Sequence, residues 1–268
     1  MDSPIIAIIP AKNEAKSIVN VLHQLERARI DGAIVVCNGC TDETSSLALS
    51  LQSQLPYDLH IVWIESALGH DVARAVGTYS ALRQHPGDGL FLYIDGDWQG
   101  AFGPMLGDFL LAGRELNCDV LSVTWSSLGS SSLVGVTAMP WRAALKMQQV
   151  VPETAAPFLL PMLVRTRMFQ HGSPMLIAHP GHFFAFAAMR GCLWMTFEDW
   201  HMELVGNPSR SRLHHAAISN RIAQDGQVAC DVLGGRPVKR LGPLANLPDR
   251  DIRTLTRYAA EASWQIEA

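Results

Sequence analysis

The first half of the chain alternates short apolar runs with longer amphipathic ones. The apolar runs have the length and composition of buried parallel strands, and they cover residues 4–9, 34–37, 59–64, 90–94 and 120–123. Between them, apolar residues recur every three or four positions, which predicts helices over 14–29, 42–54, 71–84 and 104–115. Asp42 and Asp71 are the expected N-caps of two of these helices. This alternation predicts an α/β fold, a mostly parallel, doubly wound, Rossmann-like sheet with helices on both faces.

The alternation stops after Trp125, where a Ser/Gly-rich stretch covers residues 126–132. Further on we expect apolar segments over 141–151 and 179–189, a helix over 209–224, a late strand over 227–233 and an exposed helix over 248–266. We therefore expect one compact domain in two halves. Residues 1–125 form a ligand-binding half, and residues 126–268 form a C-terminal extension that builds the site of a second substrate.

Composition narrows the class of protein. A chain of 268 residues with 48% hydrophobic content can fill a sizeable core, which excludes a disordered or fibrous protein. Its net charge of -4 gives no global attraction to nucleic acid. Five cysteines, an odd number, do not suggest a secreted disulfide framework, so we expect a cytoplasmic protein. No apolar stretch is long enough to span a membrane, although a peripheral membrane contact stays open.

The chemically distinctive residues follow the predicted strands. Residues 10–14 follow the first strand, 37–42 the second, 65–74 the third and 95–97 the fourth. In doubly wound sheets ligands bind outside the carboxyl ends of the strands, because the connecting loops converge there. The sequence therefore predicts one site built from these four loops.

Asp95, Gly96 and Asp97 suggest a metal in that site. Alternate residues of an extended segment point the same way, so a buried strand delivers two carboxylates together. Mn²⁺ or Mg²⁺ is commonly held by one or two carboxylates and the phosphates of a substrate. The competing interpretation is a solvated Asp-Gly turn, which we rank lower because the motif follows a central strand.

Four segments together resemble, in order and spacing, the motifs of family 2 glycosyltransferases with the GT-A fold. They are Ile-Ile-Pro-Ala-Lys-Asn-Glu at 8–14, Val-Val-Cys-Asn-Gly-Cys-Thr-Asp-Glu-Thr at 35–44, Ala-Arg-Ala-Val-Gly at 73–77 and Tyr-Ile-Asp-Gly-Asp at 93–97. Each motif is weak alone, but four in register are specific. The resemblance covers about the first 125 residues and, beyond them, mainly Glu198 and Asp199.

The resemblance implies a transferase that moves a sugar from a UDP- or GDP-linked donor to a hydroxyl acceptor. It implies that Pro10, Ala11 and Glu14 contact the base and ribose, Asn38 the base edge, Asp95 the ribose and metal, and Asp97 the metal. Arg74 and His70 are expected near the phosphates, with a surface charge and a solvated loop residue as the competing interpretations. The family usually has aspartate at the position of Asn38, so the identity of the base stays open.

Glu198 and Asp199 resemble the acidic pair that the family places near the acceptor. In inverting members one carboxylate deprotonates the acceptor hydroxyl, so Asp199 is the expected base, supported by Glu198. The aromatic residues Trp194, Phe197 and Trp200 are expected to desolvate it. The competing interpretation makes Asp199 the N-cap of a short segment over 199–205.

Two alternatives remain beside the inverting transferase. One is a retaining enzyme similar to glucosyl-3-phosphoglycerate synthases, in which His214 or its neighbour His215 adds a metal ligand. The other is a thioredoxin-like redox protein that uses Cys37 and Cys40, since Cys-x-x-Cys between a strand and a helix is typical of that chemistry. It leaves the Asp95–Asp97 motif unexplained. A nucleotidyltransferase would need a glycine-rich phosphate loop after the first strand, which residues 10–13 do not provide.

Overall fold

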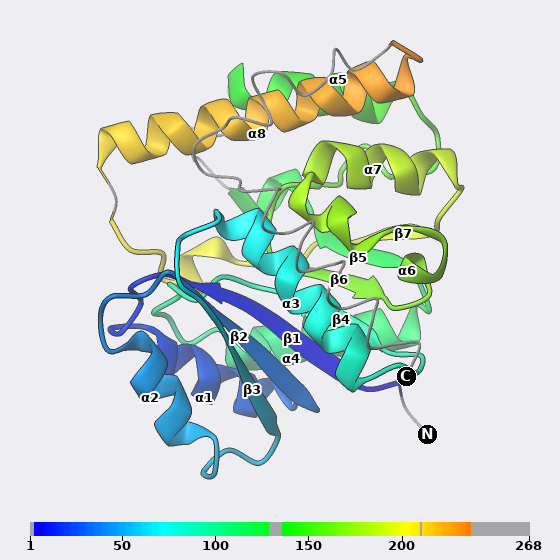
Figure 1. The fold of residues 1–268 in the computed structure, drawn as a ribbon. Coiled ribbons are helices and arrows are strands. Elements are labelled where there is room, and N and C mark those ends of the chain that lie inside the picture. The colour runs from blue at the N-terminus through cyan, green and yellow to red at the C-terminus, as the bar shows by residue number, and fades with distance from the viewer. Residues whose placement is uncertain (1–2, 129–135, 210, 237–268) are drawn as a thin grey trace.

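A single seven-stranded sheet organises the protein (Figure 1). The computed structural model describes residues 3–128, 136–209 and 211–236. The sheet order is β3-β2-β1-β4-β6-β5-β7, and every neighbouring pair is parallel except the two that involve β6. The strands are β1 Ile5–Ala11, β2 Gly32–Asn38, β3 Asp58–Ile64, β4 Leu90–Tyr93, β5 Val120–Val123, β6 Met162–Arg165 and β7 Trp194–Phe197. The predicted mostly parallel, doubly wound sheet is confirmed.

Helices cover both faces of this sheet, and the alternation of side chains along β1 shows why. Ile5, Ala7 and Ile9 pack into a core with α1, α2 and α4, whereas Ile6 and Ile8 pack into a second core with α3, α5 and α7. The helices are α1 Ile18–Ala28, α2 Thr44–Leu51, α3 His70–Gln84, α4 Gly103–Glu115, α5 Met139–Lys146, α6 Met168–His171, α7 Pro180–Met189 and α8 Arg212–Leu233. Among the described residues, no helix is both long and apolar enough to cross a membrane.

The helix starts differ from the predicted ones for local reasons. Helix α1 begins four residues late, because residues 14–17 form turns that belong to the site loop. The N-cap of α2 is Glu43, although the Asp42 side chain still accepts a hydrogen bond from the Thr44 backbone N–H at 3.0 Å. The N-cap assigned to Asp71 was wrong: α3 is capped by Gly69, and Asp71 lies in its first turn.

The C-terminal half differs more from the prediction. The late strand expected over 227–233 was wrong, because these residues continue α8, whose C-terminal half packs against α5 and α7. Its buried residues, Asp225, Gly226, Val228 and Ala229, recur at helical spacing. The predicted helix over 248–266 lies outside the described residues.

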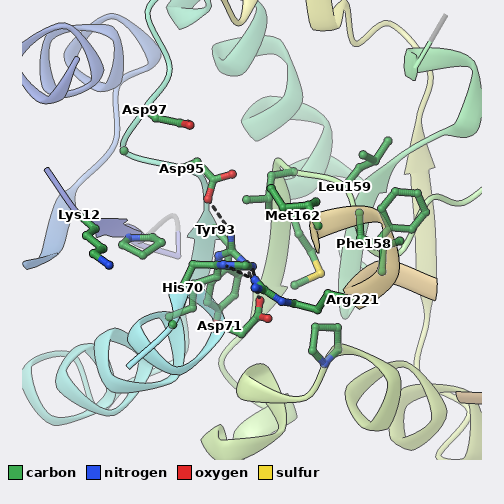
Figure 2. Close-up of a pocket in the computed structure, with 18 of the residues that line it drawn as sticks. Lys12, His70, Asp71, Tyr93, Asp95, Asp97, Phe158, Leu159, Met162 and Arg221 are labelled. Carbon is green, nitrogen blue, oxygen red and sulfur yellow. Dashed lines mark hydrogen bonds and ion pairs between the residues drawn. The ribbon is translucent and has the colours of Figure 1, made fainter. Parts of the chain in front are cut away.

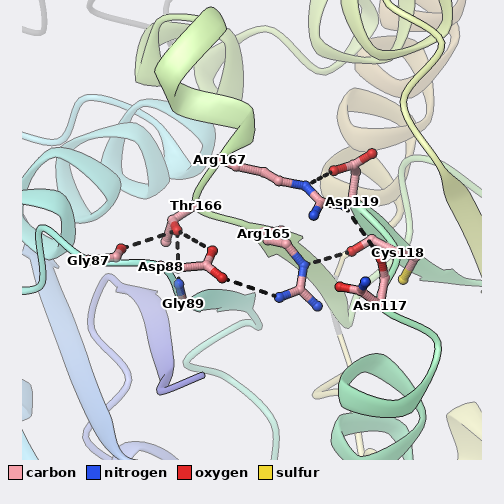
Figure 3. Close-up of polar contacts among 9 residues, drawn as sticks. All are labelled: Gly87, Asp88, Gly89, Asn117, Cys118, Asp119, Arg165, Thr166 and Arg167. Carbon is pink, nitrogen blue, oxygen red and sulfur yellow. Dashed lines mark hydrogen bonds and ion pairs between the residues drawn. The ribbon is translucent and has the colours of Figure 1, made fainter. Parts of the chain in front are cut away.

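Strand β6 joins the two halves of the chain, since it inserts antiparallel between β4 and β5. Figure 3 shows how its end is fixed. Arg165 Nε donates to the Cys118 carbonyl at 3.2 Å, Thr166 Oγ1 accepts from the Gly89 backbone N–H at 2.9 Å, and Arg167 pairs with Asp119. Asp119 also accepts from the Leu193 backbone N–H at 2.8 Å, just before β7. These bonds tie the starts of β4, β5 and β7 to one segment.

Candidate functional site

A cavity of about 640 Å³ opens at the carboxyl ends of the central strands. Its volume is ordinary for a small-molecule site. It collects all of the residues predicted to bind the nucleotide sugar, namely Pro10, Ala11, Glu14, Asn38, His70, Arg74, Asp95, Gly96 and Asp97. His214, the predicted additional metal ligand, also lines it. The sheet therefore brings together loop residues that are up to 87 positions apart in the sequence, Pro10 and Asp97, as expected for a parallel sheet.

Hydrogen bonds join the loop after β1 to the loop after β2. Asn13 adopts a left-handed backbone with φ of 58°, and its Oδ1 accepts from the Thr41 backbone N–H at 2.8 Å. The Glu14 backbone N–H donates to Thr44 Oγ1 at 2.7 Å. The Cys40 thiol donates to the Ala11 carbonyl at 3.3 Å. The two loops thus form one continuous wall of the cavity.

The Asp95–Asp97 segment packs closely against the end of β1. The Gly96 backbone N–H donates to the Pro10 carbonyl at 3.3 Å, and Ser17 Oγ donates to the Gly96 carbonyl at 2.9 Å. A Cβ at position 96 would lie 2.9 Å from the Pro10 carbonyl oxygen, so the segment has no room for a side chain there. The following Trp98 is fully buried and packs edge-on against Phe102, with ring centroids 4.9 Å apart. The two aspartates are therefore held between a fixed strand and a core tryptophan.

Arg74 connects Asp95 to the buried Asp71, and both aspartates are labelled in Figure 2. Its guanidinium pairs with Asp71 at 2.7 Å and with Oδ1 of Asp95. The Asp71 side chain is 4% exposed, Arg74 is 13% exposed, and Asp95 is 39% exposed on the cavity side. Desolvation lowers the pKa of Arg74, but the two carboxylates raise it further, so the guanidinium stays charged. Arg74 therefore contacts Asp95 directly, and its predicted contact with a phosphate stays a prediction.

His70 is neutral in this arrangement. Its side chain keeps 40% exposure, and Arg221 of α8 donates to its Nδ1 at 2.9 Å. Desolvation by the cavity walls lowers the pKa of His70 to about 4, and the nearby Arg74 and Arg221 cations add to this effect against the opposing influence of Asp71. At neutral pH His70 thus accepts a hydrogen bond from Arg221, which fastens α8 to the start of α3.

Asn38 is held by the loop after β3. Its Oδ1 accepts from the Leu68 backbone N–H at 2.7 Å, and the side chain is buried. Because a backbone N–H can only donate, this bond fixes which end of the amide is the oxygen. The amide nitrogen of Asn38, a donor, is the end left for a ligand.

The two cysteines of the Cys-x-x-Cys motif flank Asn38 and have unlike environments. A hydrogen bond from the Cys37 thiol lowers the pKa of Cys40 to about 6, whereas the same bond and burial raise the pKa of Cys37. Both are free thiols. They lie beside the wall of the cavity, and neither is one of its lining residues.

The predicted acidic pair lies outside the cavity. Glu198 and Asp199 have exposed side chains and are not lining residues of the cavity. Their aromatic neighbours point into the core instead, where Trp200 packs against Trp98 with centroids 5.9 Å apart. The desolvation expected for Asp199 is therefore absent. The expected cap is absent too, since the short helix at Met202–Leu204 begins after His201.

In the parts of the chain that the structure describes, no group of three or more His, Cys, Asp or Glu side chains is arranged to hold a metal. His214 and His215 lie on the exposed first turns of α8, where the Ser211 side chain caps the helix by accepting from the His214 backbone N–H at 3.2 Å. The metal role of His214 stays a prediction.

On one side of the cavity, sequence reasoning named only His214 and the neighbouring histidine. This side is lined by apolar residues of the segment before and into β6, by Ile177 and Phe183, and by α8, which also contributes Arg221. A partly apolar helix with two arginines, Arg212 and Arg221, carries no signal that one of them faces a cavity. Only the packing of α8 across α5 and α7 brings it over the cavity (Figure 1).

Comparison with known proteins gives a clear fold and a weak sequence relationship. No family model matches the chain. An uncharacterized protein of Methanocaldococcus jannaschii is 38% identical over 94 residues, which is 35% of this chain and 40% of that protein. The chain thus matches well under half the length of this curated relative.

Solved structures resemble the whole described fold. Glucosyl-3-phosphoglycerate synthase from Mycobacterium tuberculosis, crystallised with Mn²⁺, UDP and phosphoglyceric acid, aligns over 88% of this chain and 80% of its own, with a TM-score of 0.62 and 17% identity. The same enzyme with Mn²⁺, UDP-glucose and glycerol 3-phosphate aligns over 88% and 82%, with a TM-score of 0.60 and 15% identity. The fold is therefore the GT-A fold of these glycosyltransferases. At such identity the likeness establishes the fold alone.

Proposed function

We propose that this protein is a metal-dependent glycosyltransferase that moves a sugar from a nucleotide diphosphate sugar to a hydroxyl acceptor. One observation carries the proposal: a single cavity at the carboxyl edge of the sheet collects every residue that the four-motif resemblance assigns to the donor. The fold supports it, because solved proteins with this fold were crystallised with UDP or UDP-glucose.

The chemistry of the cavity fits a divalent cation. The carboxylates of Glu14, Asp71, Asp95, Asp97 and Asp225 outnumber the cations Lys12, Arg74 and Arg221 by two among its lining residues. Arg74 binds only Oδ1 of Asp95, so within the described residues Oδ2 has no protein partner and faces the cavity. Asp95 and Asp97 would hold Mn²⁺ or Mg²⁺ with the diphosphate, since such ions take few protein carboxylates and several phosphate oxygens. The ion would neutralise the charge that develops on the departing diphosphate.

The protein itself positions the metal ligands and the donor. Arg74 keeps Asp95 turned toward the cavity, and the bond between Gly96 and Pro10 fixes the segment against the β1 loop. The amide of Asn38 presents a hydrogen-bond donor at the far wall. Holding the donor rigidly in a partly closed cavity lowers the entropic cost of the transfer.

Calorimetric titration with UDP, with and without Mn²⁺, tests the proposal on wild type and Asp97→Asn. We expect Mn²⁺ to strengthen UDP binding by tenfold or more in wild type and to have little effect in Asp97→Asn, which keeps the shape and removes the charge. Asp108→Asn, on an exposed turn of α4, is the matched control and should behave like wild type. Equal Mn²⁺ enhancement in all three proteins would contradict the proposal.

Retention of the anomeric configuration is the better supported stereochemical outcome. Glu198 and Asp199, the acids expected to act as an inverting base, are exposed and outside the lining of the cavity. A retaining enzyme does not require a base at that position, so a transferase similar to glucosyl-3-phosphoglycerate synthases agrees better with the cavity. NMR of the product's anomeric proton decides this. An inverted product, with turnover lowered about 100-fold in Asp199→Asn, would restore the inverting mechanism.

A further inference from the structure

The cavity has two chemically different ends. One end carries Asp95, Asp97 and Lys12, and the other end is mainly apolar, formed by Phe158, Leu160, Met162, Ile177, Phe183 and Ile218. Figure 2 shows this division, with Asp97 and Lys12 on one side, Phe158 and Met162 on the opposite side, and Asp95 between them; Arg221 lies below Met162. We call the six apolar residues the apolar lobe.

The lobe is built from the core outward. Phe158 packs against Trp125 and Trp141, with ring centroids 5.3 and 6.0 Å away, so its ring is fixed from behind. Phe158, Leu160 and Met162 pack against the core while remaining only half-buried. Their free surface therefore lines the cavity, in a position set by the rigid core.

Helix α8 closes the lobe from the opposite side. Ile218 and Arg221 are one turn apart, so they lie on the same face of the helix, and the bond from Arg221 to His70 fixes that face toward the cavity. Leu213, only five residues before Ile218, is 84% exposed and does not line the cavity. Of these two apolar residues of α8, only Ile218 therefore lies over the lobe.

Keeping such a surface wet is unfavourable, so the lobe favours an apolar occupant. The donor diphosphate and metal belong to the aspartate end under the proposed function, which leaves the lobe to the second substrate. The six side chains offer no hydrogen-bond donor to a phosphate or carboxylate.

We infer that the acceptor carries its hydroxyl on an apolar body, such as an aromatic or aliphatic alcohol, and is not a small polyanion. This inference rests on the proposed function for the assignment of the lobe to the acceptor. It departs from the fold neighbours, which were crystallised with phosphoglyceric acid or glycerol 3-phosphate.

Fluorescence titration with 2-naphthol, an apolar alcohol, tests the inference on protein saturated with UDP and Mn²⁺. We expect saturable binding at one site, at least tenfold tighter than that of 3-phosphoglycerate measured by competition. Absence of saturable naphthol binding, or tighter binding of 3-phosphoglycerate, would overturn the inference.

Two variants locate the binding. Ile218→Asn should weaken naphthol binding by about fivefold to tenfold, because it removes roughly one to two methylene equivalents of apolar contact. Leu213→Asn makes a comparable change on the outward face of the same helix and should leave binding unchanged. Met162→Gln, on β6, should reproduce the effect of Ile218→Asn if the helix variant unfolds. Equal affinity in all of these proteins would place naphthol elsewhere and overturn the inference.

The experiment separates this inference from the proposed function. Loss of Mn²⁺-dependent UDP binding concerns the aspartate end, so that result alone would refute the transferase. In that case, naphthol binding that Ile218→Asn weakens would still establish the apolar pocket. The assignment of this pocket to an acceptor would be refuted. Intact UDP binding together with preference for 3-phosphoglycerate would refute the apolar acceptor alone.

Discussion

Replacing Arg74 with methionine tests whether this residue supports the site from inside. Methionine replaces the apolar stem but removes the guanidinium, and with it the charge that Asp71 and Asp95 share. Asp71 would then be a carboxylate with 4% exposure and without its nearest cation. Asp95, at 39% exposure, can be solvated by the cavity.

The expected loss follows from this difference in burial. Removing one partner of a buried ion pair costs about 3–5 kcal/mol of folding free energy. His70 Nε2 stays 3.3 Å from Asp71, and Arg74 itself is 13% exposed, so we expect the lower end, about 3 kcal/mol. Replacing the buried carboxylate as well, in Asp71→Asn/Arg74→Met, should recover part of the lost folding free energy, because no buried carboxylate is then left without a cation.

Urea unfolding, followed by tryptophan fluorescence, measures these free energies, since Trp98, Trp141, Trp194 and Trp200 are all buried. Arg83→Met, at an exposed position in the last turn of the same helix, is the control and should cost under about 1 kcal/mol. Release of Asp95 should also weaken Mn²⁺ binding in the presence of UDP by about 10- to 100-fold, as expected for a group that orients a metal ligand. An Arg74→Met protein within about 0.5 kcal/mol of wild type, with unchanged Mn²⁺ affinity, would refute the positioning role.

Three further outcomes are expected. Gly96→Ala should lower stability by about 1–3 kcal/mol and weaken Mn²⁺-dependent UDP binding, because its Cβ would lie 2.9 Å from the Pro10 carbonyl; unchanged melting temperature and affinity would contradict this. The pKa of His70 falls from 6.5 to about 4 on folding, so the unfolded chain binds the proton more readily and the free energy of unfolding should fall as the pH drops from 6.5 to 4. This fall should be less steep in His70→Gln. Urea unfolding at several pH values measures it, and parallel curves for the two proteins would contradict the prediction. The pKa of Cys40 is lowered to about 6, whereas burial raises the pKa of Cys118 to about 11, so Cys40 should react with iodoacetamide at neutral pH well before Cys118. Peptide mass mapping measures the two alkylation rates, and equal rates would contradict the prediction.

The sequence by itself determined the fold of the first half of the chain. The apolar runs are strands because each is short and bounded by turn residues, and all but the edge strand β3 are buried on both faces, so their composition predicts them. The loops that follow β1, β2 and β4 meet because parallel strands end at one edge, which is why local motifs such as Asp95–Asp97 were enough to predict a common site. Site residues that follow the strands of a regular parallel sheet can therefore be predicted from the sequence alone.

Tertiary structure decided which side chains contact one another in the cavity and which residues form its other half. Whether Arg74 faces a phosphate or Asp95, and whether Asp199 is desolvated or exposed, depends on side-chain direction and packing that spacing does not specify. The Gln227–Leu233 segment carries both helical and strand propensity, and contact with α5 and α7 selects the helix. Arg221 lies 151 residues from His70 and Ile218 lies 60 from Phe158, so their meeting is a long-range event with no local signature. The apolar lobe was therefore hidden, because each of its residues also reads as ordinary core until the chain has folded around it.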